Sequence, residues 1–212
     1  MSSPRLTAAR MLQEILEKKL FLSDVRVQLD SLQEQDKAFA NMLVLTALRR
    51  LCSIKKLLKN HIKKKLPTKA KIAEYLLIMA TVEILYLDTP SYAVLNTYVE
   101  LTKKQTDKYI AGFVNAVLRK IVATSENKQQ IDENIFFPDR FIKLLRQSYG
   151  IKTIRKIELV ALSEPPLDVS VKKTPEHWAK SLNGTILTGG TIRLRDKAPV
   201  PTLTGFNDGD WW

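Results

Sequence analysis

The 212-residue sequence has a single cysteine and two histidines. One cysteine, Cys52, excludes a disulfide scaffold and any zinc cluster built on several cysteines. The two histidines, His61 and His177, argue against a histidine metal site. Seven glycines and nine prolines exclude collagen-like chains and disordered chains rich in these residues. The length fits one or two globular domains with a substantial core.

Long apolar runs are also lacking. The longest, residues 75–87, is interrupted by Thr81 and Glu83 and is too short to span a bilayer. The amino end has no long apolar core and no small-residue cleavage site, so it does not resemble a signal peptide. We therefore expect a cytoplasmic protein with no membrane partner and with its thiol kept reduced.

No set of residues assembles into a catalytic centre. Cys52 lies beside Leu51 and Ile54, and we expect it to be a small buried side chain. No Walker loop or G-x-G-x-x-G motif is present. We assign no catalytic, cofactor-binding or metal-binding residue, and we do not expect the chain as given to be an enzyme. Glu83, inside a strongly apolar segment, is expected to pair with a neighbouring helix.

The charge is strongly one-sided. The sequence has 34 basic and 22 acidic residues, a net charge of +12, which is typical of proteins with a polyanionic partner. Residues 1–128 carry 22 basic and 12 acidic side chains, whereas residues 129–212 carry 12 and 10. Six of the seven glycines also lie in the second part. We predict two domains, residues 1–127 and 128–212, with a boundary near residues 124–138.

Apolar spacing predicts the fold class as mainly α, an all-helical domain followed by a small α+β subdomain. We expect helices in the first domain over residues 4–20, 23–32, 36–58, 69–87, 91–101 and 107–121. In the second domain we expect helices over 138–149, 151–162 and 174–182, and strands over 167–171, 185–187 and 191–194. The chain ends on Trp211 and Trp212, which we expect to be exposed. Such an end leads us to expect that the natural chain continues.

One basic stretch stands out. No acidic residue occurs between Asp36 and Glu74, while ten basic residues lie between Arg49 and Lys71. Lys55, Lys59 and Lys63 share a helical face, where like charges repel one another unless an anion binds. Phosphate backbones are the usual anion. The alternative is a solvated face that only keeps the protein soluble. No aromatics alternate with these lysines, so stacking on single-stranded bases is not indicated.

Three segments carry a family resemblance: E-I-L-Y-L-D-T-P-S-Y-A-V-L-N at 83–96, V-E-L-T-K-K at 99–104 and G-F-V-N-A-V-L-R-K at 112–120. Together they resemble the NusB-like RNA-binding fold. More closely, they resemble the front of the RsmB/Sun (Fmu) family of rRNA cytosine-C5 methyltransferases. The resemblance covers residues 5–123 and continues loosely through 137–140, 149–150 and 164–167.

This resemblance implies an RNA-docking region that precedes a Rossmann-like catalytic domain. The family's S-adenosylmethionine loop and catalytic cysteines would lie beyond residue 212. The implied partners are small-subunit ribosomal RNA and the protein's own C-terminal catalytic domain. We expect Pro90 and Ser91 to begin a helix and Gly112 to allow close helix packing. Asn115, in an apolar stripe, is expected to bond the backbone or a neighbouring helix. The predicted RNA-binding residues are Arg5, Arg10, Arg49, Arg50, Lys55, Lys56, Lys59, Lys63, Lys64 and Lys65.

Other functions remain open from the residues. A stand-alone NusB-type transcription antitermination factor would bind RNA with a NusE-like protein partner, although the second domain argues against it. A protein-interaction module would dock the catalytic domain and use its lysines for solubility alone. A truncated product without function is the third alternative.

Overall fold

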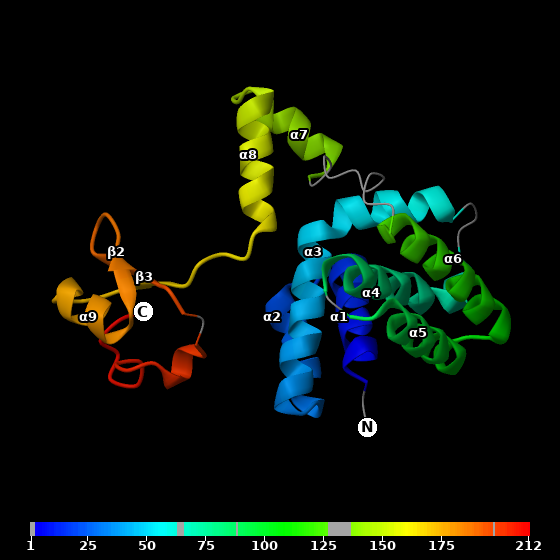
Figure 1. Ribbon diagram of the computed structural model, residues 1–212, viewed down its shortest axis with the longest axis horizontal. Helices are drawn as coiled ribbons and strands as arrows, with labels where there is room; N and C mark the ends of the chain where they lie inside the picture. Colours follow the sequence, from blue (N-terminus) through cyan, green and yellow to red (C-terminus); the bar gives the residue numbers. More distant parts are fainter. Residues whose placement is uncertain (1–2, 63–65, 88, 127–136, 197) are drawn as a thin grey trace. The chain divides into compact units, whose positions relative to one another are not determined.

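The computed structural model describes residues 3–62, 66–87, 89–126, 137–196 and 198–212. These residues form two compact units, Met1–Leu162 (unit 1) and Ser163–Trp212 (unit 2). The fold class is mainly α with a small sheet in unit 2, as predicted (Figure 1). The elements of unit 1 are α1 (Pro4–Lys18), α2 (Leu22–Val25), η1 (Arg26–Ser31), α3 (Glu34–His61), η2 (Thr68–Ala70), α4 (Ile72–Tyr86), α5 (Ser91–Gln105), α6 (Lys108–Glu126), α7 (Asp139–Leu145) and α8 (Ile151–Leu162). Those of unit 2 are β1 (Asp168–Ser170), α9 (Pro175–Ser181), β2 (Gly184–Ile186), β3 (Thr191–Leu194) and η4 (Val200–Thr202).

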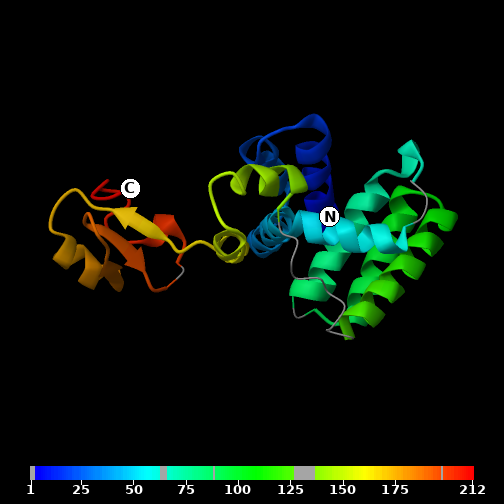
Figure 2. The same cartoon turned by 90° about the horizontal axis from the view of Figure 1, so that it is seen from above.

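Helix α4 is the centre of unit 1. Its sequence is apolar on nearly every face, which is typical of a helix surrounded by others. Ala73 and every residue from Tyr75 to Glu83 are buried, and α1, α3, α5 and α6 pack against it. Viewed from above, α5 and α6 run alongside one another (Figure 2). The predicted central helix is therefore confirmed.

Local signals set several helix starts. Pro4 follows Ser3 at the first turn of α1, as predicted. Before α6, the Asp107 carboxylate accepts a hydrogen bond of 2.9 Å from the Ile110 amide, satisfying one of the amides left free at a helix start. The helix predicted over 23–32 instead divides into α2 and η1. The first of them begins after Phe21, whose amide donates to the Asp24 carboxylate at 2.9 Å, rather than at residue 23.

Two expectations for α6 are wrong. Gly112 is exposed, and nothing lies within 4 Å of the place where a Cβ would be, so it does not allow a close helix contact. The Asn115 side chain forms no hydrogen bond with any residue of the described ranges. The apolar stripe around Asn115 suggested such a bond, but the packing of α6 does not provide it.

Unit 2 is a three-stranded antiparallel sheet in the order β1-β3-β2, with α9 packed on β2 and β3. All three predicted strands are present. Trp211 is 5% exposed in the small core, and its indole N–H donates to the Thr204 carbonyl at 2.9 Å. The expectation that both terminal tryptophans are exposed is therefore wrong for Trp211. Trp212 is 70% exposed, while its backbone pairs with Ser170 through bonds of 2.8 and 3.0 Å.

The division between the units falls after Leu162, beyond the composition change near residues 124–138. Helix α8 contacts α3, which groups the α7–α8 segment with unit 1. Amino-acid composition does not reveal a contact of this kind between helices that lie far apart in the sequence. Residues 1–162 carry 28 basic and 16 acidic side chains, and residues 163–212 carry six of each. The entire excess of positive charge therefore belongs to unit 1. Whether residues 1–127 form a domain by themselves stays a prediction.

Candidate functional site

The second half of α3 presents a row of lysines. Lys55, Lys56 and Lys59 are exposed, while Ile54 and Leu58 on the opposite face are buried in the core. Burial of Ile54 and Leu58 fixes the rotation of α3 about its axis, and the lysine ammonium groups are therefore directed to solvent. Lys63, Lys64 and Lys65, which we predicted to extend the row, lie outside the described residues.

The arginines that precede this row are partly buried. The Arg50 guanidinium lies over the Tyr86 ring, 4.5 Å from its centroid, which is the geometry of a cation–π contact. Such a contact restricts the side chain while its N–H groups stay able to donate. Arg49, Lys55 and Lys59 form no ion pair with a residue of the described ranges.

Other lysines of unit 1 differ from this row. Lys18 pairs with Glu14 at 2.7 Å, and Lys37 pairs with Glu34 at 2.8 Å. Both pairs join residues three or four apart on one helix. No acidic residue is close enough in sequence to do the same for Lys55 or Lys59. We define the α3 surface as Arg49, Arg50, Lys55, Lys56 and Lys59. Within the described residues, the charges of Lys55 and Lys59 have no acidic partner.

Arg5 has a different environment. Its Nε and Nη2 donate to the two carboxylate oxygens of Glu83 at 2.8 and 2.7 Å. The Tyr98 hydroxyl donates to Glu83 at 2.6 Å, and the guanidinium also lies over Phe39. Glu83 is fully buried and the Arg5 side chain is 24% exposed. The expected pairing of Glu83 is thus confirmed, and it joins α1, α4 and α5.

The pKa directions agree with this arrangement. Burial lowers the pKa of Arg5, but the hydrogen bonds to Glu83 and its negative charge outweigh burial, and the net shift is upward. Burial and the charge of Glu83 raise the pKa of Tyr98 well above its ordinary value. Arg5 therefore stays charged and engaged within unit 1. Its predicted contact with RNA stays a prediction, and the structure gives its guanidinium a partner inside the bundle.

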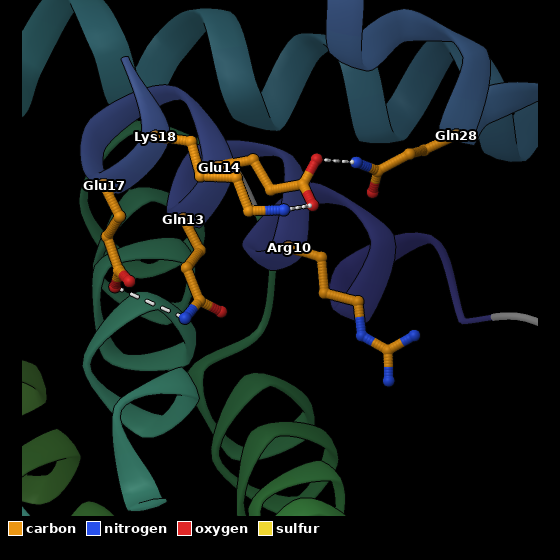
Figure 3. Close-up of a pocket in the computed structure, with 6 residues that line it drawn as sticks. All are labelled: Arg10, Gln13, Glu14, Glu17, Lys18 and Gln28. Carbon is orange, nitrogen blue, oxygen red and sulfur yellow. Dashed lines mark hydrogen bonds and ion pairs between the residues drawn. The ribbon is translucent and has the colours of Figure 1, made fainter. Parts of the chain in front are cut away.

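Arg10 borders a hollow between α1 and η1. The hollow measures about 320 Å³ and is lined by Arg10, Gln13, Glu14, Glu17, Lys18 and Gln28. Glu14 accepts hydrogen bonds from Lys18 and Gln28, and Gln13 donates to Glu17 (Figure 3). The Arg10 guanidinium points away from these groups and donates to Gln105 at 3.1 Å. The polar groups inside the hollow thus satisfy one another, whereas Arg10 faces outward.

The described residues offer no catalytic centre. Cys52 is half-buried rather than buried as expected, and desolvation raises the pKa of its thiol, which disfavours the nucleophilic thiolate at neutral pH. No group of three metal-ligating side chains occurs within the described ranges. The strands β1, β2 and β3 are short and antiparallel. The expectation that this chain binds no cofactor stays a prediction.

A second basic group was missed by sequence reasoning. Six exposed cations lie on α7, α8 and the loop between them: Arg140, Lys143, Arg146, Lys152, Arg155 and Lys156. Their density was visible in the sequence, since residues 137–162 hold six basic and two acidic side chains. Summing charge over 129–212 hid it, because unit 2 is balanced.

Comparison with known proteins decides the family. The profile of the NusB family matches residues 2–123, which is more than half of the chain. The chain belongs to the NusB family. The matched NusB region comprises α1 to α5 and most of α6, and it includes the whole α3 surface. No helix in the described ranges of this family member is long and apolar enough to cross a membrane.

Similarity to longer relatives extends over 97% of the chain. "Ribosomal RNA small subunit methyltransferase B" of Salmonella paratyphi B is 26% identical over 220 aligned positions, and that of Escherichia coli is 24% identical. The chain spans about half the length of these curated relatives, 51% in both cases, and corresponds to their N-terminal half. The resemblance identified from the sequence is thereby confirmed.

A solved structure shares the fold. The crystal structure of PH0851 superposes with a TM-score of 0.60 and 14% sequence identity, covering 100% of this chain and 53% of that one. At this identity the likeness concerns fold alone. It covers the residues of both units, so another chain combines a helical fold like that of unit 1 with a small sheet like that of unit 2.

Proposed function

We propose that this chain is the RNA-docking region of an rRNA methyltransferase and that the α3 surface contacts the phosphate backbone of ribosomal RNA. The observation that carries the proposal is the uncompensated charge of Lys55 and Lys59 on an exposed helix face. Membership of the NusB family and similarity to small-subunit rRNA methyltransferases support RNA as the polyanion.

Counterion release supplies the binding free energy. Each lysine or arginine that neutralises a phosphate frees condensed counterions, and affinity then falls steeply with salt. Such contacts position the protein on RNA without reading its sequence. Arg50, held against Tyr86, would add a donor of fixed direction. Lys63, Lys64 and Lys65 lie outside the described residues, and their contact with RNA stays a prediction.

The chain itself would hold RNA and leave methyl transfer to another part of the protein. We propose that the second half of a full-length relative supplies S-adenosylmethionine binding and the catalytic cysteines. The partners are then ribosomal RNA and that catalytic half, in the cytoplasm. The similarity over both units favours this arrangement over a stand-alone antitermination factor.

Charge reversal tests the site assignment. Lys55→Glu with Lys59→Glu should weaken binding to a small-subunit rRNA fragment by about tenfold or more at moderate salt. The matched control is Lys172→Glu with Lys180→Glu, which changes net charge equally on exposed lysines of unit 2. The control should retain affinity. Equal losses of affinity in both variants would show that net charge, and not the α3 surface, determines RNA binding. If the wild type binds no RNA, the alternative of a protein-interaction module would be favoured.

A further inference from the structure

The α7–α8 hairpin, residues 137–162, combines two features that the α3 surface does not. It carries six exposed cations, and it exposes two aromatic rings, Phe141 at 45% and Tyr149 at 49%. Proteins that bind single-stranded nucleic acid pair these same features, with cations along the backbone and aromatic faces under the bases. The combination therefore differs in kind from a row of lysines alone.

The orientation of α8 gathers its cations on one side. Ile154 is fully buried and Glu158 is 4% exposed, so the face that they share is directed inward. Lys152, Arg155 and Lys156 occupy the opposite side at helical spacing of three and four residues. Like charges at this spacing repel one another, and an anion would remove that repulsion.

None of these six cations forms an ion pair with a residue of the described ranges. The hairpin has two carboxylates, and one of them, Glu158, is buried and accepts a hydrogen bond from the Phe137 amide at 3.4 Å. The exposed surface of the hairpin is thus almost purely cationic.

The two aromatic residues are anchored in different ways, Tyr149 through its backbone and Phe141 through its ring. Tyr149 follows α7, and its amide donates to the Leu145 carbonyl at 2.8 Å, which fixes the start of its side chain. Phe141 meets the Phe137 ring edge to face, with centroids 5.1 Å apart. Less side-chain entropy is lost when a base stacks on Phe141, because contact with Phe137 already restricts its ring.

The hairpin also lies close to the α3 surface within unit 1. Helix α8 contacts α3, and the Cys52 thiol feels the charges of both Lys55 and Asp139. The first turn of α7 is therefore near the beginning of the lysine row. One RNA could reach both places.

We propose that the α7–α8 hairpin is a second RNA-contact element that binds a single-stranded segment, with its cations on phosphates and Tyr149 and Phe141 under bases. The inference rests on the proposed function, because both need RNA as ligand, but it concerns different residues. Charged residues are depleted at the centre of protein interfaces, so six cations favour RNA over a protein partner here.

Two probes separate the two elements: a short poly-uridine oligonucleotide, which is single-stranded, and an RNA duplex of the same length. Tyr149→Leu keeps the apolar bulk and removes the aromatic face. It should weaken poly-uridine binding by about fivefold or more and leave duplex binding unchanged. The matched control is Trp212→Leu, which removes an exposed aromatic ring from unit 2 and should change neither affinity. Fluorescence anisotropy measures both, and unchanged circular dichroism shows that the variants fold.

The cations are tested by Lys152→Gln with Arg155→Gln and Lys156→Gln. Three phosphate contacts fewer should reduce the salt slope for poly-uridine by about two. If both hairpin variants bind poly-uridine as the wild type does, while Lys55→Glu with Lys59→Glu weakens binding, the inference is wrong and the proposed function stands. If the α3 reversal also has no effect, both are wrong. Equal losses on both probes from Tyr149→Leu would contradict base stacking.

Discussion

Units 1 and 2 differ most in their charge. Unit 1 holds the whole excess of twelve positive charges, whereas unit 2 has six basic and six acidic residues. In unit 2, Arg193 donates two hydrogen bonds of 2.8 Å to the Asp168 carboxylate, which joins β3 to β1. Its charge thus supports the sheet, whereas that of the α3 surface faces solvent. This difference places the proposed RNA contact in unit 1.

The units also differ in how they are stabilised. Unit 1 encloses α4 within other helices, whereas the 50 residues of unit 2 depend on a few side chains around Trp211. Domains of that size bury a smaller share of their surface and are marginally stable. All three tryptophans, Trp178, Trp211 and Trp212, lie in unit 2. Tryptophan fluorescence therefore reports unit 2, and far-ultraviolet circular dichroism reports mainly the helices of unit 1.

The largest effect is expected from Arg5→Ala. Without Arg5, the buried Glu83 carboxylate keeps the Tyr98 hydroxyl but loses its charged partner. Breaking a buried pair in this way should lower the free energy of unfolding of unit 1 by about 3 kcal/mol. Urea denaturation followed by circular dichroism measures it. Lys103→Ala, which removes an exposed pair with Glu100, is the control and should cost at most about 0.5 kcal/mol. Similar losses in the two variants would show that Glu83 is not held as described.

Gly205→Ala should destabilise unit 2 selectively. Gly205 has a φ of +84°, and a Cβ there would overlap the Trp178 ring. Left-handed backbone and overpacking together should cost about 2 kcal/mol. Thermal unfolding should show an earlier transition by tryptophan fluorescence and an unchanged transition by circular dichroism. A shift of both signals together would mean that the units unfold as one.

Gly112→Ala should stabilise unit 1, whereas the two substitutions above each destabilise their unit. The position is exposed, helical and free of neighbours for a Cβ, so alanine should stabilise unit 1 by up to about 1 kcal/mol. Urea denaturation again measures the change, with Trp fluorescence expected to stay constant. A loss of stability would show instead that Gly112 allows close helix packing, as expected from the sequence.

The smallest effect concerns pH. Hydrogen bonds from Arg193, followed by its charge, hold the pKa of Asp168 below its ordinary value despite some desolvation. A lowered pKa stabilises the folded state above the ordinary value near 3.9, and this contribution is lost as pH falls through the lowered value. The fluorescence-detected melting temperature should therefore fall in acid, and less so in Asp168→Asn. An identical acid dependence in the variant would show that the Arg193–Asp168 pair does not stabilise unit 2.

Much of the fold could be predicted because its signals are local. The apolar run around Ile78, the Pro4 start and the alternation around Val169 each reflect neighbours in sequence, and each element appears where predicted. The burial of Trp211 could not be predicted, because it depends on pairing with Val171, forty residues earlier. The attachment of α8 to α3 is likewise a long-range contact.

The candidate site was predictable only in part. The lysines of α3 could be found because they are closely spaced and lack acidic neighbours. Arg5 is also basic, yet its guanidinium binds Glu83, 78 residues away. Residue type alone cannot separate an arginine that pairs inside the bundle from one that faces solvent.

We propose that unit 1 docks on ribosomal RNA through phosphate contacts. A salt titration of the full chain tests this most directly, with a small-subunit rRNA fragment and a scrambled RNA of the same length and composition. We expect affinity to fall steeply with salt and the rRNA fragment to bind more tightly than the scrambled RNA. A lack of binding to either RNA at low salt would contradict it.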